Sequence, residues 1–163
     1  MKILFKLLCC ILTFSLLFFT SCTDGGKKEI IKEYETSVLA SESCGIDDVT
    51  FVPNGYKAEK YSTLYGIVYE CEYRNDNSYS VLRIVPSEYT TSNLSGYTDT
   101  LLFEVYKVGE TEYEIESREG VFACEFTTEF SGKECDISYV LSGGTADDFK
   151  AQLKELVTYL KGE

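Results

Sequence analysis

The sequence predicts an α+β domain, in which a meandering antiparallel β-sheet is followed by a C-terminal α-helix packed on one of its faces. Three observations lead to this fold class. Apolar and polar residues alternate with a period of two over most of the chain from Val49 to Leu141, and turn-forming residues interrupt the alternation. A segment with helical spacing follows. The 13 tyrosines suit the half-buried, pleated surface of a sheet.

The first 21 residues are predicted to be a signal peptide that precedes the domain. Lys2 and Lys6 come before an uncharged, largely apolar stretch between Leu7 and Phe19. About a dozen residues are too few to cross a hydrocarbon core of roughly 30 Å comfortably. Removal of this segment leaves 13 basic and 27 acidic residues, which is a formal charge of −14.

The segment "FTSC", residues 19–22, resembles the lipobox of bacterial lipoproteins, because small residues directly precede Cys22. It departs from that family at Phe19, where an aliphatic residue is preferred. The resemblance implies a diacylglyceryl group on the sulfur of Cys22, cleavage just before it, and a chain held by lipid in the cell membrane on its extracytoplasmic side. The alternative is an ordinary secretory signal cut near Ser21, which leaves Cys22 as a thiol. Residues 22–29 contain two glycines and mixed charges, as expected of a flexible tether.

Residues 30–45 are predicted to form a short helix or an extended lead-in to a single α+β domain over residues 46–163. The first hairpin of that domain is clearer. One strand places its apolar residues inward and Glu70 and Glu72 outward, residues 75–78 form the turn, and the returning strand ends at a proline, which cannot donate to a β-ladder. The residues expected to face inward are Ile67, Tyr69, Cys71, Tyr73, Leu82 and Ile84.

The second half of the sheet follows a polar loop and leads into the helix. Its last hairpin is expected to turn at Ser131-Gly132. Thr145 and Asp148 have the spacing of a capping box at the start of the helix. On the first strand after the loop, the residues expected to face inward are Leu101, Phe103 and Val105. The apolar stripe of the helix consists of Phe149, Leu153, Leu156, Val157 and Leu160.

Four cysteines remain after the signal, and an even number in an exported chain predicts two disulfides. They are Cys44, Cys71, Cys124 and Cys135. No Cys-x-x-Cys spacing occurs among them, so neither a zinc ribbon nor a thioredoxin-type redox site is indicated. With a two-residue turn at 131–132, Cys124 and Cys135 lie four residues out of register, well beyond the roughly 7 Å reach of a disulfide. The other pairings stay open.

The composition excludes several function classes. A charge of −14 repels nucleic acid, so a nucleic-acid partner is not expected. The chain has no histidine, which removes the usual general base and metal ligand, and we expect no catalytic residue, no metal site and no cofactor. Glu70 and Glu72 have the spacing of any solvated strand face, and neither "GIDD" nor "RNDN" matches a calcium-binding loop.

The order of a Pro53-Asn54-Gly55-Tyr56 stretch, a hairpin, a long loop, further strands and a helix resembles a family of small extracytoplasmic domains of unknown function in Gram-positive bacteria. The resemblance covers roughly residues 48–160, and domains of that family often open with Pro-x-Gly-Tyr. The chain departs from the family in having four cysteines and no tryptophan in the penultimate strand. The resemblance implies the fold and the location, and it brings no catalytic residues.

Taken together, these features favour a membrane-anchored, non-catalytic binding module for an unknown protein or cell-wall partner. The loop from Ser87 to Thr98 is long for a hairpin connection and carries Tyr89 and Tyr97, so it is the predicted contact surface. One alternative is a carrier whose aromatic inner face holds a small apolar ligand. Another is an enzyme that works without histidine.

Overall fold

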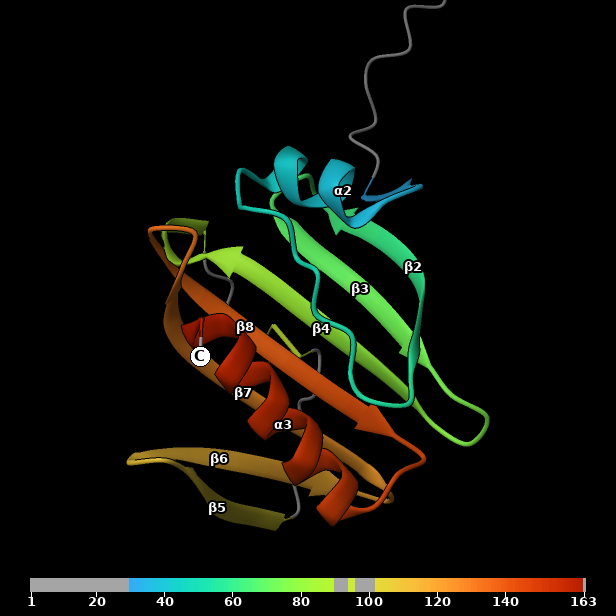
Figure 1. The fold of residues 1–163 in the computed structure, drawn as a ribbon, viewed down its shortest axis with the longest axis vertical. Helices are drawn as coiled ribbons and strands as arrows, with labels where there is room; N and C mark the ends of the chain where they lie inside the picture. Colours follow the sequence, from blue (N-terminus) through green and yellow to red (C-terminus); the bar gives the residue numbers. More distant parts are fainter. Residues whose placement is uncertain (1–29, 90–93, 96–101, 163) are drawn as a thin grey trace, which may run out of the picture.

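The computed structural model describes residues 30–89, 94–95 and 102–162, which form one eight-stranded antiparallel sheet with helices α2 and α3 (Figure 1). The sheet-dominated α+β class is therefore confirmed. The predicted signal, the Cys22 anchor, the tether and Tyr97 lie outside the described residues. The strands are β1 (Ile31–Tyr34), β2 (Lys57–Leu64), β3 (Val68–Arg74), β4 (Tyr79–Pro86), β5 (Leu102–Val108), β6 (Thr111–Arg118), β7 (Val121–Phe130) and β8 (Lys133–Ser142). The helices are α2 (Ser37–Cys44), the 3-10 turn η1 (Ser87–Tyr89) and α3 (Ala146–Lys161).

The strand order β1-β2-β3-β4-β8-β7-β6-β5 corrects the prediction of one continuous meander. The sheet consists of two four-stranded meanders, and the last strand of each, β4 and β8, pair with each other along their length. A period-two pattern identifies strands and their faces, but it carries no information about pairing between strands that are distant in sequence. The junction of the two meanders is therefore a tertiary feature.

The β7–β8 hairpin has the register that its turn predicts. Phe130 pairs with Lys133, and Cys124 faces Tyr139. The two turn residues between the strands have φ values of +61° and +66°. Positive φ at both central residues is the signature of a type I′ turn, whose twist matches that of the flanking strands. Local turn chemistry thus sets the register of the longest pair of strands.

The inner face of the sheet is filled by side chains. The inward residues predicted for β3 and β4 are fully buried, with the exception of Ile67, which lies in the β2–β3 turn and packs with Val68 and Val85 on the outer face. Phe51 packs edge-on against Tyr73 with ring centroids 5.9 Å apart. The Phe149 ring of α3 stacks on Tyr139 at 5.8 Å. Aromatic packing of this kind leaves the core between sheet and helix occupied by protein.

Strand β5 reverses the predicted facing of its residues. Phe103 and Val105 are 67% and 56% exposed, and their neighbour Glu104 instead accepts a hydrogen bond from Nζ of Lys150 on α3 at 2.5 Å. The prediction that Phe103 and Val105 face inward is wrong, and Leu101 lies outside the described residues. This strand carries apolar residues at both odd and even positions, so alternation alone does not select the face that packs inward.

Residues 30–45 contain both an extended segment, β1, and a short helix, α2. Strand β1 pairs with the Leu64 end of β2, so residues 31–34 are part of the sheet. Helix α2 starts directly after Thr36, whose hydroxyl accepts a hydrogen bond from the Leu39 amide. The chain therefore adds an edge strand and a capped two-turn helix before the main run of strands.

Helix α3 begins with the predicted capping box. The Thr145 hydroxyl accepts from the Asp148 amide at 3.1 Å, and the Asp148 carboxylate accepts from the Thr145 amide at 2.9 Å. These contacts satisfy amide groups that a helix start leaves without partners. The five residues of the predicted stripe are all buried.

We expect Thr145→Ala to lower the free energy of unfolding by about 1 kcal/mol, because it removes the N-cap acceptor. Hydrogen bonds from Thr145 hold the pKa of Asp148 below its ordinary value. The stabilisation they give is present above the ordinary pKa of a carboxyl group and disappears as the pH falls through the lowered value. Urea unfolding at neutral and acidic pH should show the difference shrinking in acid. Thr145→Ser keeps the acceptor and serves as the control.

Candidate functional site

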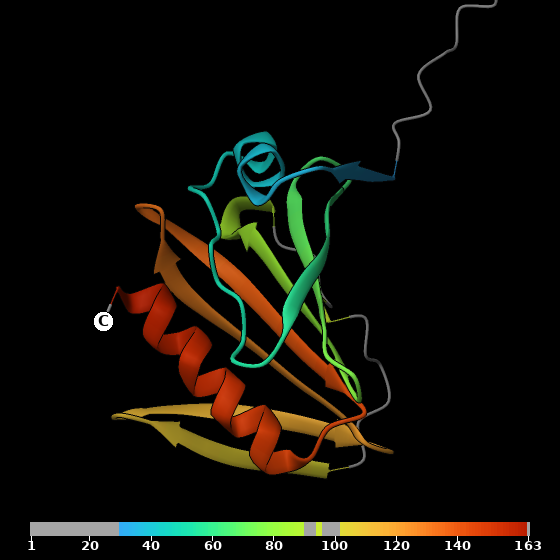
Figure 2. The same ribbon diagram turned by 45° about the vertical axis from the view of Figure 1, so that its right-hand side comes forward.

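A polar pocket of about 360 Å³ lies at the end of the sheet away from β1 and α2. Four segments that are distant in sequence form its walls: the turn before β2, the β3–β4 turn, the β8–α3 connection and the first half of α3 (Figure 2). The residues that line it are Asn54, Tyr56, Asn75, Asn77, Ser78, Gly143, Gly144, Asp148, Ala151, Gln152 and Glu155.

A chain of hydrogen bonds connects the core to the wall of this pocket. The buried hydroxyl of Tyr139 donates to Oε1 of Gln152 at 2.5 Å, and Nε2 of Gln152 donates to the hydroxyl of Tyr56 at 3.2 Å. The Tyr56 hydroxyl in turn contacts Oγ of Ser78, which donates to Oδ1 of Asn75 at 2.9 Å. Burial raises the pKa of Tyr139, so its hydroxyl keeps the proton that it donates. These hydrogen bonds establish that Oε1 of Gln152 is an acceptor and that its Nε2 is a donor.

The β3–β4 turn is held in place by the same asparagine. Besides the Ser78 hydroxyl, Oδ1 of Asn75 accepts from the backbone amides of Asn77 and Ser78, at 2.9 and 2.8 Å. The backbone amide of Asn75 donates to the Ser78 carbonyl at 3.1 Å. With its carbonyl oxygen used three times, Asn75 contributes its amide nitrogen as a donor. The turn is therefore a rigid, preformed wall.

The charged groups of the pocket are both carboxylates. One oxygen of Asp148 is used in the capping box, and one oxygen of Glu155 accepts from the Asn54 backbone amide at 3.0 Å. The residues that line the pocket include neither lysine nor arginine. Such a pocket repels anions and offers acceptors and amide donors to uncharged or cationic groups.

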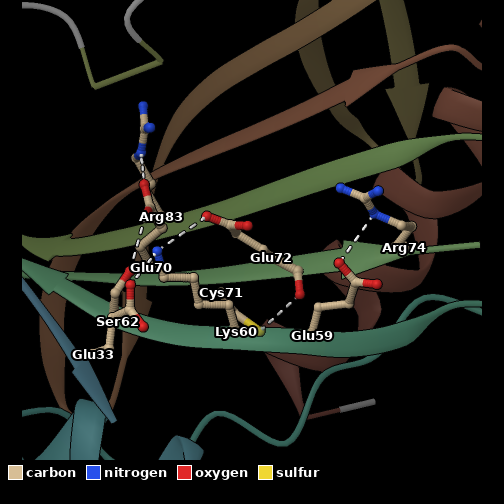
Figure 3. Close-up of polar contacts among 9 residues, drawn as sticks. All are labelled: Glu33, Glu59, Lys60, Ser62, Glu70, Cys71, Glu72, Arg74 and Arg83. Carbon is tan, nitrogen blue, oxygen red and sulfur yellow. Dashed lines mark hydrogen bonds and ion pairs between the residues drawn. The ribbon is translucent and has the colours of Figure 1, made fainter.

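The outer face of β2, β3 and β4 carries an ion pair whose carboxylate is buried and whose guanidinium is partly exposed (Figure 3). Glu70 accepts from Nε of Arg83 at 2.7 Å and from the hydroxyl of Ser62 at 3.0 Å. The Arg83 guanidinium also donates to the carbonyls of Leu94 and Ser95, at 2.8 and 3.1 Å. The pair therefore fastens part of the β4–β5 connection to the sheet, and Glu70 is engaged in structure.

Neighbouring charges on these strands form more exposed pairs (Figure 3). Lys60 contacts Glu33 at 2.7 Å and Glu72 at 4.0 Å, and Arg74 contacts Glu59 at 3.0 Å. In a hydrolase, two carboxyl groups act as acid and base because different surroundings move their pKa values apart. The carboxylates on this face pair with cations, and no apolar surrounding of this kind is present among them. The part of the outer face around Lys60 and Arg74 is a solvated, charge-compensated sheet surface.

The predicted contact loop is only partly described. Tyr89 ends η1 and is 48% exposed, whereas Leu94 is buried against Val68 and Val85 on the outer face of the sheet. The described part of the loop is thus anchored by apolar packing, by Arg83 and by Glu125, which accepts a hydrogen bond from the Ser95 amide.

The two predicted disulfides are not present in the structure, in which the four thiols of the described residues are unbridged and buried. The register explains why. Cys71 and Cys124 lie in one row across β3, β4, β8 and β7, separated by Leu82 and Tyr139. Three strand spacings amount to roughly 14 Å, about twice the reach of a disulfide. Cys135 is four residues from that row along β8, so it is distant from both Cys71 and Cys124.

Each way of pairing the four cysteines into two disulfides includes one of these excluded pairs. Burial raises the pKa of the thiols, to about 11 for Cys44 and Cys71, to about 12 for Cys124, and above the ordinary value for Cys135. Thiols in this state are inert small apolar residues of the core.

We expect iodoacetamide at pH 8 to leave all four thiols unmodified in the folded protein and to alkylate all four in urea, without any reductant. Burial and raised pKa values suppress the reactive thiolate in the native state. Intact-mass spectrometry counts the adducts. A reduced sample is the control, and a count that rises after reduction would contradict the unbridged assignment.

Sequence analysis did not identify the pocket. In the sequence, "PNGY" contributes to the family resemblance, "RNDN" does not match a calcium-binding loop, and Gln152 is a single polar residue on an apolar helix face. Nothing in the sequence brings Tyr56 and Gln152 together, because they are 96 residues apart. A polar residue inside the helix stripe was the one available signal, since buried amides need partners.

Among the described residues, no helix combines the length and the apolar character needed to cross a bilayer. Their His, Cys, Asp and Glu side chains form no group of three or more that could hold a metal ion. No protein-family model matches the chain, and neither the curated proteins nor the solved structures include a match.

Proposed function

We propose that the protein is a non-catalytic binding module, anchored in the membrane through Cys22 on the extracytoplasmic side, that holds a small uncharged polar ligand in the pocket beside α3. The observation that carries this proposal is the preorganised chain of hydrogen bonds from Tyr139 through Gln152 to the pocket wall. Preorganised polar groups in a concave site are the usual basis of specific small-molecule binding.

The chemistry of the pocket indicates the class of ligand. Asn54 and Asn77 supply side-chain amides, Asn75 supplies an amide nitrogen, and Asp148 and Glu155 supply acceptors. Ligands rich in hydroxyl and acetamido groups, such as N-acetylated amino sugars, can both donate to the carboxylates and accept from the amides of the pocket. A phosphate or carboxylate ligand would meet two carboxylates without a cation. Of the uncharged and cationic groups that the pocket suits, an uncharged saccharide uses the amide donors as well as the carboxylate acceptors, and it is the proposed ligand class.

The alternatives receive less support. A carrier of apolar ligands needs an empty apolar interior, whereas Phe51, Tyr73, Tyr139 and Phe149 pack directly on one another. A hydrolase without histidine would need a carboxylate pair in an apolar setting or a lysine base, and Glu70 is paired with Arg83. In this proposal α3 lies on the inner face of the sheet and forms one wall of the binding pocket. Tyr89 and Tyr97 would form a second contact for a protein or cell-wall partner.

The test is saturation-transfer NMR on the purified protein with N-acetylglucosamine and its disaccharide, followed by calorimetric titration. We expect saturation transfer to the acetyl and ring protons of these sugars. We expect Asn77→Ala to weaken binding at least about tenfold, because it removes a donor and an acceptor from the wall.

Asp76→Ala is the matched control, since Asp76 is in the same exposed turn but does not line the pocket. Its affinity should equal that of the wild type. Equal losses in the two variants, or a preference for sulfated over uncharged sugars, would contradict the proposed site. Failure of every uncharged sugar to transfer saturation would contradict the ligand class.

A further inference from the structure

The end of the domain where β1 and α2 lie carries a set of exposed apolar side chains. We call it the N-terminal apolar patch, and it consists of Ile30, Ile31, Val38, Leu39 and Tyr65, which are 41–59% exposed. Both ribbon views place β1 and α2 together at this end, far from the first turn of α3 (Figures 1 and 2). These residues lie on β1, on α2 and in the β2–β3 turn, which are neighbouring elements at this end of the domain, and exposed apolar residues on neighbouring elements indicate an interaction surface.

Backbone contacts hold the patch together. The Tyr65 amide donates to the Ile30 carbonyl at 2.7 Å, and Ile31 pairs with Leu64 in the β1–β2 ladder. Helix α2 follows β1 after two residues and buries Ala40 and Cys44, whereas Val38 and Leu39 of its first turn stay exposed. The patch is thus a built surface that the core of the domain does not use.

The chain outside the described residues identifies the occupant. Seven residues separate Cys22 from Ile30, and even a fully extended chain over this interval spans at most about 29 Å. A lipid anchor at Cys22, which is part of the proposed function, therefore keeps the patch within one short connection of the bilayer. Aliphatic residues with a tyrosine suit the boundary between lipid headgroups and acyl chains.

We propose that the N-terminal apolar patch rests on the lipid bilayer and orients the anchored domain. Strand β3, which is about 20 Å long, separates the patch from the pocket. Its first residues pair with the part of β2 that lies next to β1, and its last residue leads into the β3–β4 turn. With the patch on the membrane, the polar pocket therefore faces away from the lipid and toward the space outside the cell. Contact between the patch and the bilayer would give the domain a defined orientation, which a flexible tether alone does not.

The absence of tryptophan from the whole chain permits a direct test. Leu39→Trp places the single tryptophan of the protein in the patch, and Val105→Trp places it on the outer face of β5 at comparable exposure, 49% against 56%. The full chain is purified from membranes and reconstituted in vesicles of phosphatidylcholine, whose headgroup has no net charge to repel the acidic domain, with and without brominated acyl chains. We expect at least about twofold quenching and a blue-shifted emission for Leu39→Trp, and neither for Val105→Trp.

Each outcome has a distinct meaning. Protein that floats with the vesicles but shows no quenching at position 39 overturns the docking proposal and leaves the anchor and the pocket in place. A blue shift without quenching by brominated lipid means that protein and not lipid surrounds position 39, and this result also overturns the docking proposal. Protein that does not float with the vesicles contradicts both the lipid anchor and the docking proposal. Sugar binding tests the pocket independently of both. Val38→Trp is a second reporter if Leu39→Trp unfolds.

Discussion

Replacement of Arg83 by methionine is expected to lower the free energy of unfolding by about 3 kcal/mol, the largest effect of any single polar substitution considered for this domain. The Glu70 side chain is only 9% exposed and would be left with Ser62 as its remaining partner. A buried carboxylate without its cation retains the full cost of desolvation. Methionine keeps most of the apolar volume of arginine, so lost packing contributes little. Urea denaturation at neutral pH measures the difference.

Arg74→Met is the matched control, because it breaks an ion pair of similar length on the same face. The two side chains of that pair are 56% and 46% exposed, and exposed pairs contribute less than about 1 kcal/mol. The double variant Arg83→Met with Glu70→Met should recover part of the stability lost by Arg83→Met alone. Equal costs for Arg83→Met and Arg74→Met would refute a special role for burial.

The Arg83 substitution also tests the anchoring of the β4–β5 connection. The carbonyls of Leu94 and Ser95 lose their guanidinium donor in the variant. We therefore expect faster proteolysis near Leu94 than in the Arg74 variant, because local protection depends on these contacts. The buried Leu94 side chain and the hydrogen bond from the Ser95 amide to Glu125 would still hold this part of the loop on the sheet.

The parts of the fold that depend on neighbouring residues could be predicted from the sequence. Alternation placed Tyr69, Leu82 and Ile84 in the core, the Ser131-Gly132 turn set the register of β7 and β8, and Thr145 capped α3. In each case the deciding interactions occur within one strand, one turn or one helical end. Local chemistry of this kind is legible without any knowledge of the tertiary structure.

Features that depend on distant residues could not be predicted. The pairing of β4 with β8 placed Cys71 and Cys124 in one row and excluded the disulfides that their even number suggested. The face of β5 that lies inward carries Tyr106 and Val108, which pack against the core, and this choice of face depends on residues of other elements. Two residues of the pocket wall, Gln152 and Tyr56, are 96 positions apart in the sequence, and no periodic pattern encodes the hydrogen bond between them.

Gly143 lies where the β8–α3 connection approaches the β3–β4 turn closely. We expect Gly143→Ala to lower the free energy of unfolding by at least about 2 kcal/mol. Its φ of +83° disfavours any side chain, and a Cβ here would lie 2.9 Å from the backbone carbonyl oxygen of Asn77. That oxygen belongs to the β3–β4 turn, so the clash cannot be relieved by rotating a side chain. The two segments must separate, and they form adjacent walls of the polar pocket.

Gly109→Ala isolates the effect of the close approach. Gly109 has a φ of +62° with open space around its position, so alanine there should cost about 1 kcal/mol from backbone strain alone. Urea unfolding of both variants gives the excess cost of the clash, and titration with the N-acetylglucosamine disaccharide measures its consequence for the pocket. We expect Gly109→Ala to bind as the wild type does and Gly143→Ala to bind more weakly, because its walls are displaced. Equal stabilities for the two variants would show that the β3–β4 turn yields freely, and the pocket would then lack the rigidity on which specific binding depends.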